Sequence, residues 1–287
     1  KKNLIIKVNN RPVGEAAPNI RFNQTIDIIK SEFESIKSKL PNNLNLLSSF
    51  VYELQDWSLS NCLKCALEMS CLSLLSEKKS YSCITSYSIP ILEITEYKDF
   101  FNQLNLSRFK VLKVKLNTKQ VKERLDCVRS LYKGAIFVDF NEAFDSVRDF
   151  KKVIPSLNDN KVQLVEQPLR DKMYKDCGEF SGELLSEIFL DESILDNDFP
   201  KDLNKYVDGV NIKLQKSGGL LRSKEQISMA KEMNLKTMIG CMVESSLGIS
   251  YAMQLADKAD YFDLDGSLMI ENEPFGMVKE RNGRIYS

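Results

Sequence analysis

Histidine is absent from this sequence of 287 residues. Hydrolysis by a Ser-His-Asp triad, proteolysis by a Cys-His pair and zinc or iron sites with histidine ligands are therefore all excluded. Proton transfer near neutral pH has to come from lysine, aspartate, glutamate, cysteine or tyrosine side chains with a shifted pKa.

The sequence also lacks net charge, because 40 basic side chains balance 40 acidic ones. Neither nucleic acid nor an anionic membrane surface is expected as a partner. No apolar run approaches the roughly 20 residues that a membrane-spanning helix needs. With 43% hydrophobic and 28% charged residues, the composition is typical of a soluble globular protein.

Cysteine is present in an odd number, seven. This number, and an apolar stretch at residues 4–6 that is too short for a signal peptide, predict a reducing, cytoplasmic compartment. Cys62 and Cys65 form a CxxC motif, but no second CxxC completes a zinc site. The apolar residues around them have helical spacing, which predicts that both lie in a hydrophobic core.

Two different patterns follow one another along the chain. Residues 1–79 contain a strand-like start, a turn at 9–12 and helical patterns at 25–40 and 59–75, which predict a small α+β domain. Residues 80–287 contain eight short apolar runs that alternate with amphipathic stretches. These candidate strands cover residues 87–91, 111–116, 136–140, 162–166, 188–191, 209–214, 237–240 and 261–264.

Repeated strand–helix alternation limits the architectures available to residues 80–287. Parallel strands need crossover connections, so the eight candidate strands predict a TIM-like (β/α) barrel, capped by the N-terminal α+β domain. The nearly continuous apolar character of the runs suits strands that are covered on both faces. An open, doubly wound sheet is the structural alternative.

Three successive candidate strands end in a carboxylate: Asp139, Glu166 and Asp191. The ends of neighbouring barrel strands lie together, so these side chains are expected to converge. Three carboxylates at one point repel one another unless a cation lies among them. Oxygen ligands without histidine or cysteine favour a hard divalent ion, Mg²⁺ before Mn²⁺. The alternative is that each acid is a separate solvated residue after its strand.

Lysines lie at the ends of two further candidate strands. Lys113 and Lys115 alternate along one strand and so point to the same face, while Lys213 approaches from the opposite side of the ring. Near a divalent cation and a second ammonium group, the pKa of a lysine falls toward neutrality. One lysine would then remove a proton from a bound carbon and another would return it to the opposite face, as in a racemase or epimerase. The alternative is that Lys113 or Lys213 only neutralises the acids.

In combination, these motifs resemble the enolase superfamily, and within it the muconate-lactonizing subgroup. The resemblance covers about residues 10–275. It rests on KxK at 113–115, DxN at 139–141, EQP at 166–168, DES at 191–193 and NIKLxKSGG at 211–219, and the segment 14–18 resembles the end of the family's capping-domain hairpin.

The resemblance implies roles for individual residues. Lys115 and Lys213 would be the catalytic acid/base pair, with Lys113 as a supporting cation and Asn141 as a supporting residue. The three strand-end carboxylates would be the Mg²⁺ ligands. The family's first capping strand and its mobile specificity loop are not recognised in this sequence.

Asp263, Asp265 and the segment 240–246 are similar to dipeptide epimerases within this subgroup. In that family the two aspartates of the eighth strand hold the α-ammonium of the peptide. An anionic pair opposite the metal would accept such a cation and leave the substrate carboxylate to the metal. The implied reaction is Mg²⁺-dependent epimerisation of a dipeptide at Cα, with L-Ala-L-Glu from murein as the first candidate.

Two residues are of special interest for the substrate site. Phe140 replaces the small residue that is usual in the DxN motif, and it would crowd the site if it pointed inward. Arg21 is expected either to reach an acidic side chain of the substrate or to be a solvated surface arginine.

Other functions remain open at this point. An o-succinylbenzoate synthase or another muconate-lactonizing-type enzyme would use the same metal site and lysines, but it would leave the acid pair of the eighth strand unexplained. A non-catalytic barrel that binds metal or peptide is the alternative from a different class. Such barrels often form symmetric homo-oligomers, and the sequence does not decide the number of copies.

Overall fold

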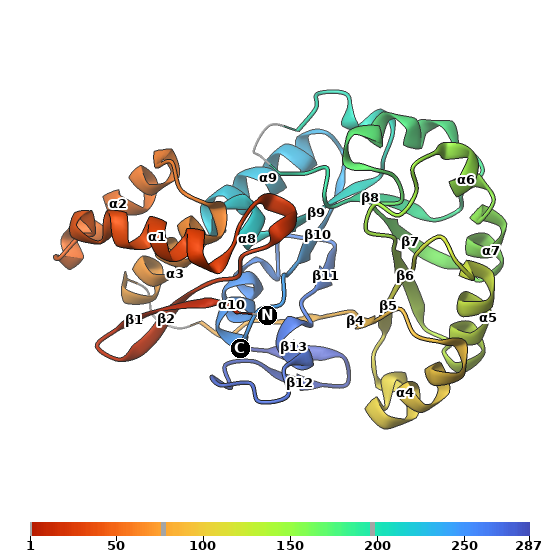
Figure 1. Cartoon of the computed structure of the whole chain (residues 1–287), viewed down its shortest axis with the longest axis horizontal. Coiled ribbons are helices and arrows are strands. Elements are labelled where there is room, and N and C mark those ends of the chain that lie inside the picture. The colour runs from red at the N-terminus through yellow and green to blue at the C-terminus, as the bar shows by residue number, and fades with distance from the viewer. Residues whose placement is uncertain (1, 76–78, 196–198) are drawn as a thin grey trace.

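The structure is a computed structural model that describes residues 2–75, 79–195 and 199–287 (Figure 1). Its N-terminal part begins with an antiparallel hairpin of β1 (Leu4–Val8) and β2 (Arg11–Ala16). The turn between them uses Asn9 and Asn10, both at positive φ, as two-residue hairpin turns require. Three helices follow: α1 (Ile26–Ile36), α2 (Leu47–Glu53) and α3 (Asn61–Leu75). Thr25 caps α1, because its side chain accepts a hydrogen bond from the Ile28 backbone N–H.

Eight parallel strands form one sheet whose spatial order follows the sequence. The strands are β4 (Tyr87–Ile89), β5 (Val111–Lys115), β6 (Ala135–Asp139), β7 (Val162–Glu166), β8 (Glu187–Leu190), β9 (Gly209–Lys213), β10 (Lys236–Gly240) and β11 (Tyr261–Asp263). The two outer strands approach each other at a seam, where the Ser86 N–H donates to the Phe262 carbonyl oxygen at 3.0 Å. The sheet is therefore a nearly closed barrel.

Helices cover the outside of the barrel (Figure 1). They are α4 (Tyr97–Leu104), α5 (Val121–Leu131), α6 (Val147–Lys151), α7 (Ile154–Asp159), α8 (Leu214–Ser217), α9 (Leu220–Glu232) and α10 (Ser246–Ala252). Phe137, Leu164, Phe189 and Met238 fill the interior, where they form a separate buried cluster. Within the described ranges, no helix has both the length and the apolar character that crossing a membrane requires.

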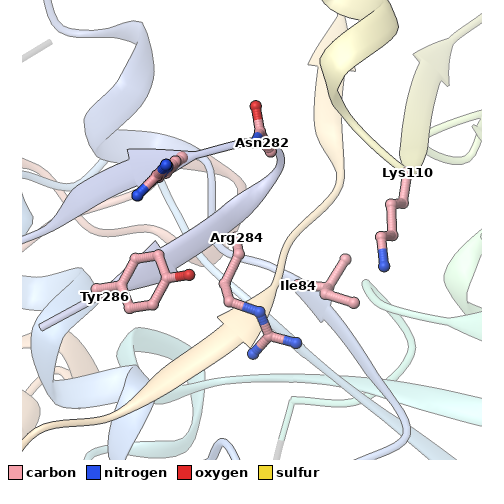
Figure 2. A pocket seen from close by; sticks show the side chains of 6 residues that line it. Ile84, Lys110, Asn282, Arg284 and Tyr286 are labelled. Carbon is pink, nitrogen blue, oxygen red and sulfur yellow. The ribbon is translucent and has the colours of Figure 1, made fainter.

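A small antiparallel sheet lies beside the N-terminal ends of the barrel strands. It pairs the hairpin of β12 (Lys279–Arg281) and β13 (Arg284–Tyr286) with β3 (Ser82–Ile84). Residues of this sheet and Lys110 line a cavity of about 340 Å³ (Figure 2).

Two buried glutamates join the N-terminal part to the barrel. Glu15 in β2 accepts hydrogen bonds from the Ser245 hydroxyl and the Gly248 N–H, at the start of α10. Glu68 in α3 accepts from the Leu221 N–H at 2.9 Å, at the start of α9. A side chain at Gly219 would collide with Glu68, since its Cβ would lie 1.4 Å from Oε2. The barrel segment that carries Lys213 is thus held against α3.

The structure confirms the predicted fold class. Each of the eight candidate strands is present with its bounds shifted by at most a few residues, and the strand order is that of a barrel, not of a doubly wound sheet. The helical patterns at 25–40 and 59–75 correspond to α1 and α3. Cys62 and Cys65 lie in the buried core of α3, as their spacing predicted. The domain boundary at residues 79 and 80 stays a prediction.

Candidate active site

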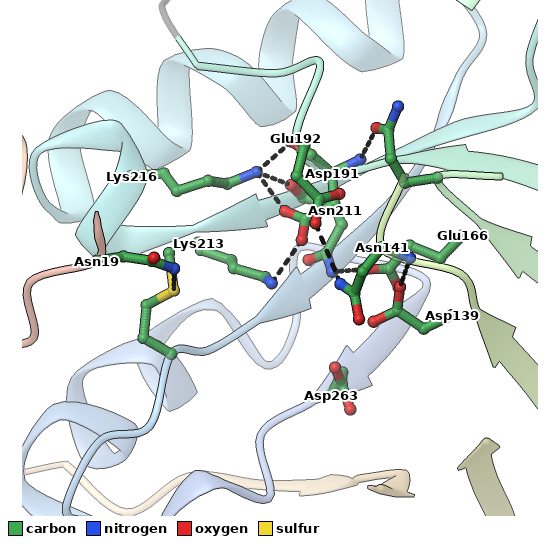
Figure 3. A network of polar contacts seen from close by, with 12 residues as sticks. Asn19, Asp139, Asn141, Glu166, Asp191, Glu192, Asn211, Lys213, Lys216 and Asp263 are labelled. Atoms are coloured by element: carbon green, nitrogen blue, oxygen red, sulfur yellow. Dashed lines mark hydrogen bonds and ion pairs between the residues drawn. The ribbon is translucent and has the colours of Figure 1, made fainter. Parts of the chain in front are cut away.

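Polar side chains gather at the C-terminal ends of the barrel strands (Figure 3). Asp139 ends β6 and Glu166 ends β7, and the two residues are direct neighbours in the strand register. Asp191 follows the last residue of β8. All three carboxylates are buried, with exposed fractions of 1%, 0% and 4%. Buried charge of one sign needs compensation nearby, and here lysines provide it.

Lys113 lies at the centre of the acidic cluster and is 2% exposed. Its Nζ is 3.2 Å from Asp139 Oδ2, 2.8 Å from Glu166 Oε2 and 2.7 Å from Asp263 Oδ2. Burial alone would lower the pKa of Lys113, but the surrounding carboxylates raise it well above its ordinary value. Lys113 is therefore held as an ammonium group among three carboxylates.

Lys115 is the more accessible lysine of β5, with a side chain that is 39% exposed. Because it lies two residues after Lys113, it points to the same face, and its Nζ is 3.2 Å from the same Asp139 oxygen. Its second partner is Asn141 Oδ1, at 2.9 Å. Burial alone would raise the pKa of Asp139, but Lys113 and Lys115 lower it to about 2. Asp139 is an anion at neutral pH.

Lys213 ends β9, on the other side of the ring from β5, since three strands separate the two in the strand order. Its Nζ donates to Asp191 Oδ2 at 2.7 Å. Burial opposes its charge, but Asp191 raises the pKa of Lys213 above its ordinary value. Lys216, one helical turn further on, donates to Asp191 Oδ1 and to two backbone carbonyl oxygens. Asp191 is thus held between two ammonium groups.

Asp263 ends β11 and Asp265 lies in the loop that follows, and both side chains contact the β4 segment. Asp263 accepts from the Ser86 hydroxyl at 2.5 Å and Asp265 accepts from the Ser88 N–H at 2.6 Å. Burial raises the pKa of Asp265 to about 7, and the neighbouring charge of Asp263 adds to this effect. Both side chains are buried, and Asp263 already pairs with Lys113.

Arg21 and Phe140 lie differently from the way the sequence alone suggested. The Arg21 guanidinium binds both oxygens of Glu142, at 2.8 and 2.9 Å, and lies 3.1 Å from Asp171 Oδ2. It therefore links the segment after β2 to the loops after β6 and β7. Phe140 points away from the site and packs edge-on against Phe144 and Phe150, so it does not crowd the mouth.

The donor set of the three carboxylates suits a hard cation. Every candidate ligand atom is an oxygen, and Glu166 Oε2 is a buried atom without a hydrogen bond, although Lys113 lies at ion-pair distance from it. Burial raises the pKa of Glu166 to about 7. As the side chains stand, no three acidic or cysteine groups of the described residues are close enough to share one ion. Lysines take the positions between the acids, so the ligand role stays a prediction.

Three further polar residues of this site lie within the DES and NIKLxKSGG motifs, which by themselves assigned them no role. Asn211 lies two residues before Lys213 on β9 and donates to Glu166 Oε1 at 2.9 Å. Strand alternation could have revealed it, because Lys213 was already expected to face inward. Lys216 and Glu192 had weaker signals: a spacing of one helical turn after Lys213, and a position next to Asp191.

The sequence and the fold resemble those of known proteins. Residues 96–267 match the family described as "Enolase C-terminal domain-like". The chain belongs to the enolase superfamily. An L-Ala-D/L-amino acid epimerase from Flavobacterium johnsoniae is 30% identical over 95% of this chain and 84% of its own length. An L-Ala-D/L-Glu epimerase from Bacteroides thetaiotaomicron is 32% identical over 62% of this chain, and the match spans 46% of that relative.

The fold is shared with solved structures of the same superfamily. A dipeptide epimerase from Methylococcus capsulatus complexed with Mg ion superposes with a TM-score of 0.81 at 23% identity, over 95% of this chain and 86% of that one. Epimerases are isomerases, and the superfamily membership together with these relatives identifies the chain as an isomerase.

Proposed function

We propose that this enolase-superfamily protein epimerises dipeptides at Cα, with Mg²⁺ as its cofactor and Mn²⁺ as a possible substitute. The observation that carries the proposal is the placement of Lys115 and Lys213 on opposite sides of one ring of strands, with buried carboxylates between them. The curated relatives named as epimerases of L-Ala dipeptides support the substrate class. L-Ala-L-Glu is therefore the first substrate to test.

The two lysines would act as a pair. Lys213 is an ammonium group held by Asp191, which is the form that delivers a proton. Lys115, half-buried beside Asn141, would remove the Cα proton on the other face when it is neutral. In the reverse direction the two exchange roles. Each lysine therefore serves one face of the bound Cα.

The intermediate of such a reaction carries extra negative charge on the substrate carboxylate, and fixed positive charge must stabilise it. Asp139, Glu166 and Asp191 would hold Mg²⁺, which supplies Lewis-acid stabilisation of that charge when bound. Lys113 adds an ammonium group that is already buried among these acids. The same charge would have a weaker effect if it were exposed, because water screens it.

The opposite end of the dipeptide carries an ammonium group. We assign its binding to Asp263 and Asp265, whose carboxylates lie together at the end of β11. Arg21 would not contact the substrate directly, since its guanidinium is already bound to Glu142 and Asp171. It would shape the mouth by fixing the segment after β2. A cytoplasmic location stays a prediction from the cysteine content.

The decisive experiment measures Cα hydrogen exchange in D₂O with Mg²⁺ across a library of dipeptides, read by mass spectrometry and chiral separation. We expect exchange and inversion for a subset that includes L-Ala-L-Glu. Absence of exchange for every dipeptide, with Mg²⁺ binding intact, would reject the function. Tight dipeptide binding without exchange would support a non-catalytic barrel instead.

A further inference from the structure

Glu192 occupies a buried position next to Asp191 at the mouth of the barrel. Its side chain is 8% exposed. Oε1 accepts a hydrogen bond from Asn141 Nδ2 at 3.1 Å, whereas Oε2 is buried without a hydrogen-bond partner among the described residues. Burying a carboxylate without a full set of hydrogen bonds is unfavourable. The hydrogen bond from Asn141 offsets part of this cost.

The contact with Asn141 fixes the orientation of an amide. Asn141 follows β6 and has a left-handed backbone, with φ of 44°. Its amide nitrogen donates to Glu192, so its amide oxygen must face the other way, where it accepts from Lys115 Nζ at 2.9 Å. Its backbone N–H donates to Asp139 Oδ1. If the amide turned over, its N–H₂ group would face the Lys115 ammonium and repel it.

We propose that Glu192 is a positioning residue for Lys115 and acts through the amide of Asn141. This inference rests on the proposed function, in which Lys115 serves one face of Cα. An acceptor at residue 192 holds the amide oxygen toward Lys115, and the lysine then stays aligned with that face. Lys213 is held by Asp191 and not by Asn141, so the effect is confined to one of the two lysines.

Because the effect is limited to Lys115, loss of Glu192 should slow Cα exchange of one epimer more than that of the other. A general loss of structure would slow both epimers equally. In D₂O, one pure epimer loses its Cα proton to Lys115 and the other loses it to Lys213. Glu192→Leu should slow exchange of the Lys115-dependent epimer at least about 10-fold more than exchange of the other. Glu192→Gln keeps an acceptor for Asn141 Nδ2 without the charge, and it should restore nearly equal exchange. Asn141→Ala, at an exposed position, should show the same asymmetry as Glu192→Leu.

These experiments test the role of Glu192 independently of the proposed epimerase function. If the unaltered protein exchanges both epimers but Glu192→Leu slows them equally, the positioning role is wrong and the epimerase function stands. If Glu192→Gln behaves like Glu192→Leu, the charge matters and not the orientation of the amide. Calorimetry with Mg²⁺ alone completes the test. A loss of affinity of about 10-fold or more in Glu192→Gln would make Glu192 a metal ligand and overturn the proposal.

A second, independent observation lies at the opposite end of the barrel, in the cavity of about 340 Å³ (Figure 2). Lys110, Arg281 and Arg284 line it, together with Asn282 and Tyr286, and none of the described residues that line it is acidic. Arg281 and Arg284 are direct cross-strand neighbours in the β12–β13 hairpin. Like charges that face each other across two strands destabilise the pair unless a counter-ion lies between them.

No carboxylate of the described residues compensates these cations. Lys110, Arg281 and Arg284 form no ion pair within the described part of the chain, and Arg284 donates only to the Ser82 hydroxyl, at 3.2 Å. The acid of the hairpin, Glu280, is bound to Arg108 and to the Gly283 N–H. Asp260, which lines the adjoining cavity, accepts from the N–H and the hydroxyl of Thr237.

We infer that this cavity binds a small oxyanion, of the class of a phosphate ester, between the two arginines. Guanidinium groups bind phosphate oxygens in a bidentate manner, and the Tyr286 hydroxyl and Asn282 amide add neutral donors. The volume exceeds that of a bare phosphate and suits an ester of modest size. The site is separate from the proposed active site, because its residues lie at the N-terminal ends of the strands.

The probe is inorganic phosphate, with pyrophosphate and citrate in parallel arms, measured by calorimetry and thermal unfolding at low salt. We expect phosphate to raise the Tm, and the double variant Arg281→Gln/Arg284→Gln to bind at least about 10-fold more weakly. Without phosphate, this variant should be at least as stable as the unaltered protein, because the repulsion is removed. The matched control, Arg11→Gln in β2, should change neither result. The proposed site would be wrong if the double variant bound phosphate as tightly as the unaltered protein, or if it had a lower Tm in the absence of phosphate.

Discussion

Glu68 allows a prediction of how the stability of this protein depends on pH. Its carboxylate lies in α3, is fully buried and accepts the Leu221 N–H from the barrel, while Oε2 has no hydrogen-bond partner among the described residues. Burial raises the pKa of Glu68 from 4.5 to about 7, although the backbone N–H groups of Leu221 and Leu220 oppose the shift. The folded protein therefore favours the protonated form, which can donate where the carboxylate cannot.

The sign of the effect follows from linkage. A carboxyl group whose pKa is raised on folding stabilises the protein fully below pH 4.5, and this contribution is lost as the pH rises through 7. A shift from 4.5 to about 7 corresponds to about 3 kcal/mol at 1.36 kcal/mol per pKa unit. Glu68→Gln is neutral at every pH and keeps an acceptor for Leu221. The variant should therefore gain stability relative to the unaltered protein as the pH rises from 5 to 8.

The assay is urea unfolding at pH 5, 6, 7 and 8, with the exposed Glu34→Gln as a matched control. The difference in unfolding free energy between Glu68→Gln and the unaltered protein should grow by about 2.5 kcal/mol over this range, since part of the effect is already lost at pH 5. Any constant loss from a poorer fit of the amide would shift the whole curve without changing its slope. Parallel curves for the two proteins would refute the reasoning, since the carboxyl group would then have its ordinary pKa in the fold.

Three further outcomes are expected at the mouth of the barrel. Lys213→Ala should lower Cα exchange at least about 100-fold while Mg²⁺ binding measured by calorimetry persists, and retained inversion would exclude Lys213 as a proton carrier. Asp265→Asn should raise KM for dipeptides about 10-fold or more with a smaller change in kcat, because it removes a charged partner of the ammonium group. Arg21→Gln should lower the unfolding free energy by at most about 1 kcal/mol, as the guanidinium is 40% exposed. Selective loss of acidic dipeptides in that variant would instead assign Arg21 to substrate binding.

The barrel could be predicted from the sequence because its strands are buried on both faces. Such strands leave short, nearly continuous apolar runs, and in this chain the runs of β5, β6 and β7 each end in a polar residue of the site. The same alternation that places Lys113 and Lys115 on one face would have placed Asn211 beside Lys213. These inferences need only the period of a strand and the rule that strand ends lie together.

Contacts between distant segments could not be predicted in the same way. Glu68 accepts from a residue 153 positions away, and Arg21 binds a glutamate 121 positions away. Neither pair has a local sequence signal, because the partners meet only after the N-terminal part packs on the barrel. The ion pairs of the acidic cluster have the same origin. The sequence showed acids and lysines at strand ends, but it did not show that Lys113 would lie between three carboxylates.

Lys216 provides a test of whether Asp191 holds a cation, without any measurement of activity. Its ammonium group donates to one oxygen of Asp191 and to the carbonyl oxygens of Asp191 and Asn211, all of them buried. Lys216→Met keeps an apolar chain of similar length but removes one of the two ammonium partners of the buried Asp191 carboxylate, which should cost at most about 3–5 kcal/mol because Lys213 remains. A divalent ion bound by Asp191 would restore the missing positive charge. Saturating Mg²⁺ should therefore raise the Tm of Lys216→Met by more than it raises that of the unaltered protein. If Mg²⁺ raised the Tm of both proteins equally, the ion would bind elsewhere, and Asp191 would not be a metal ligand.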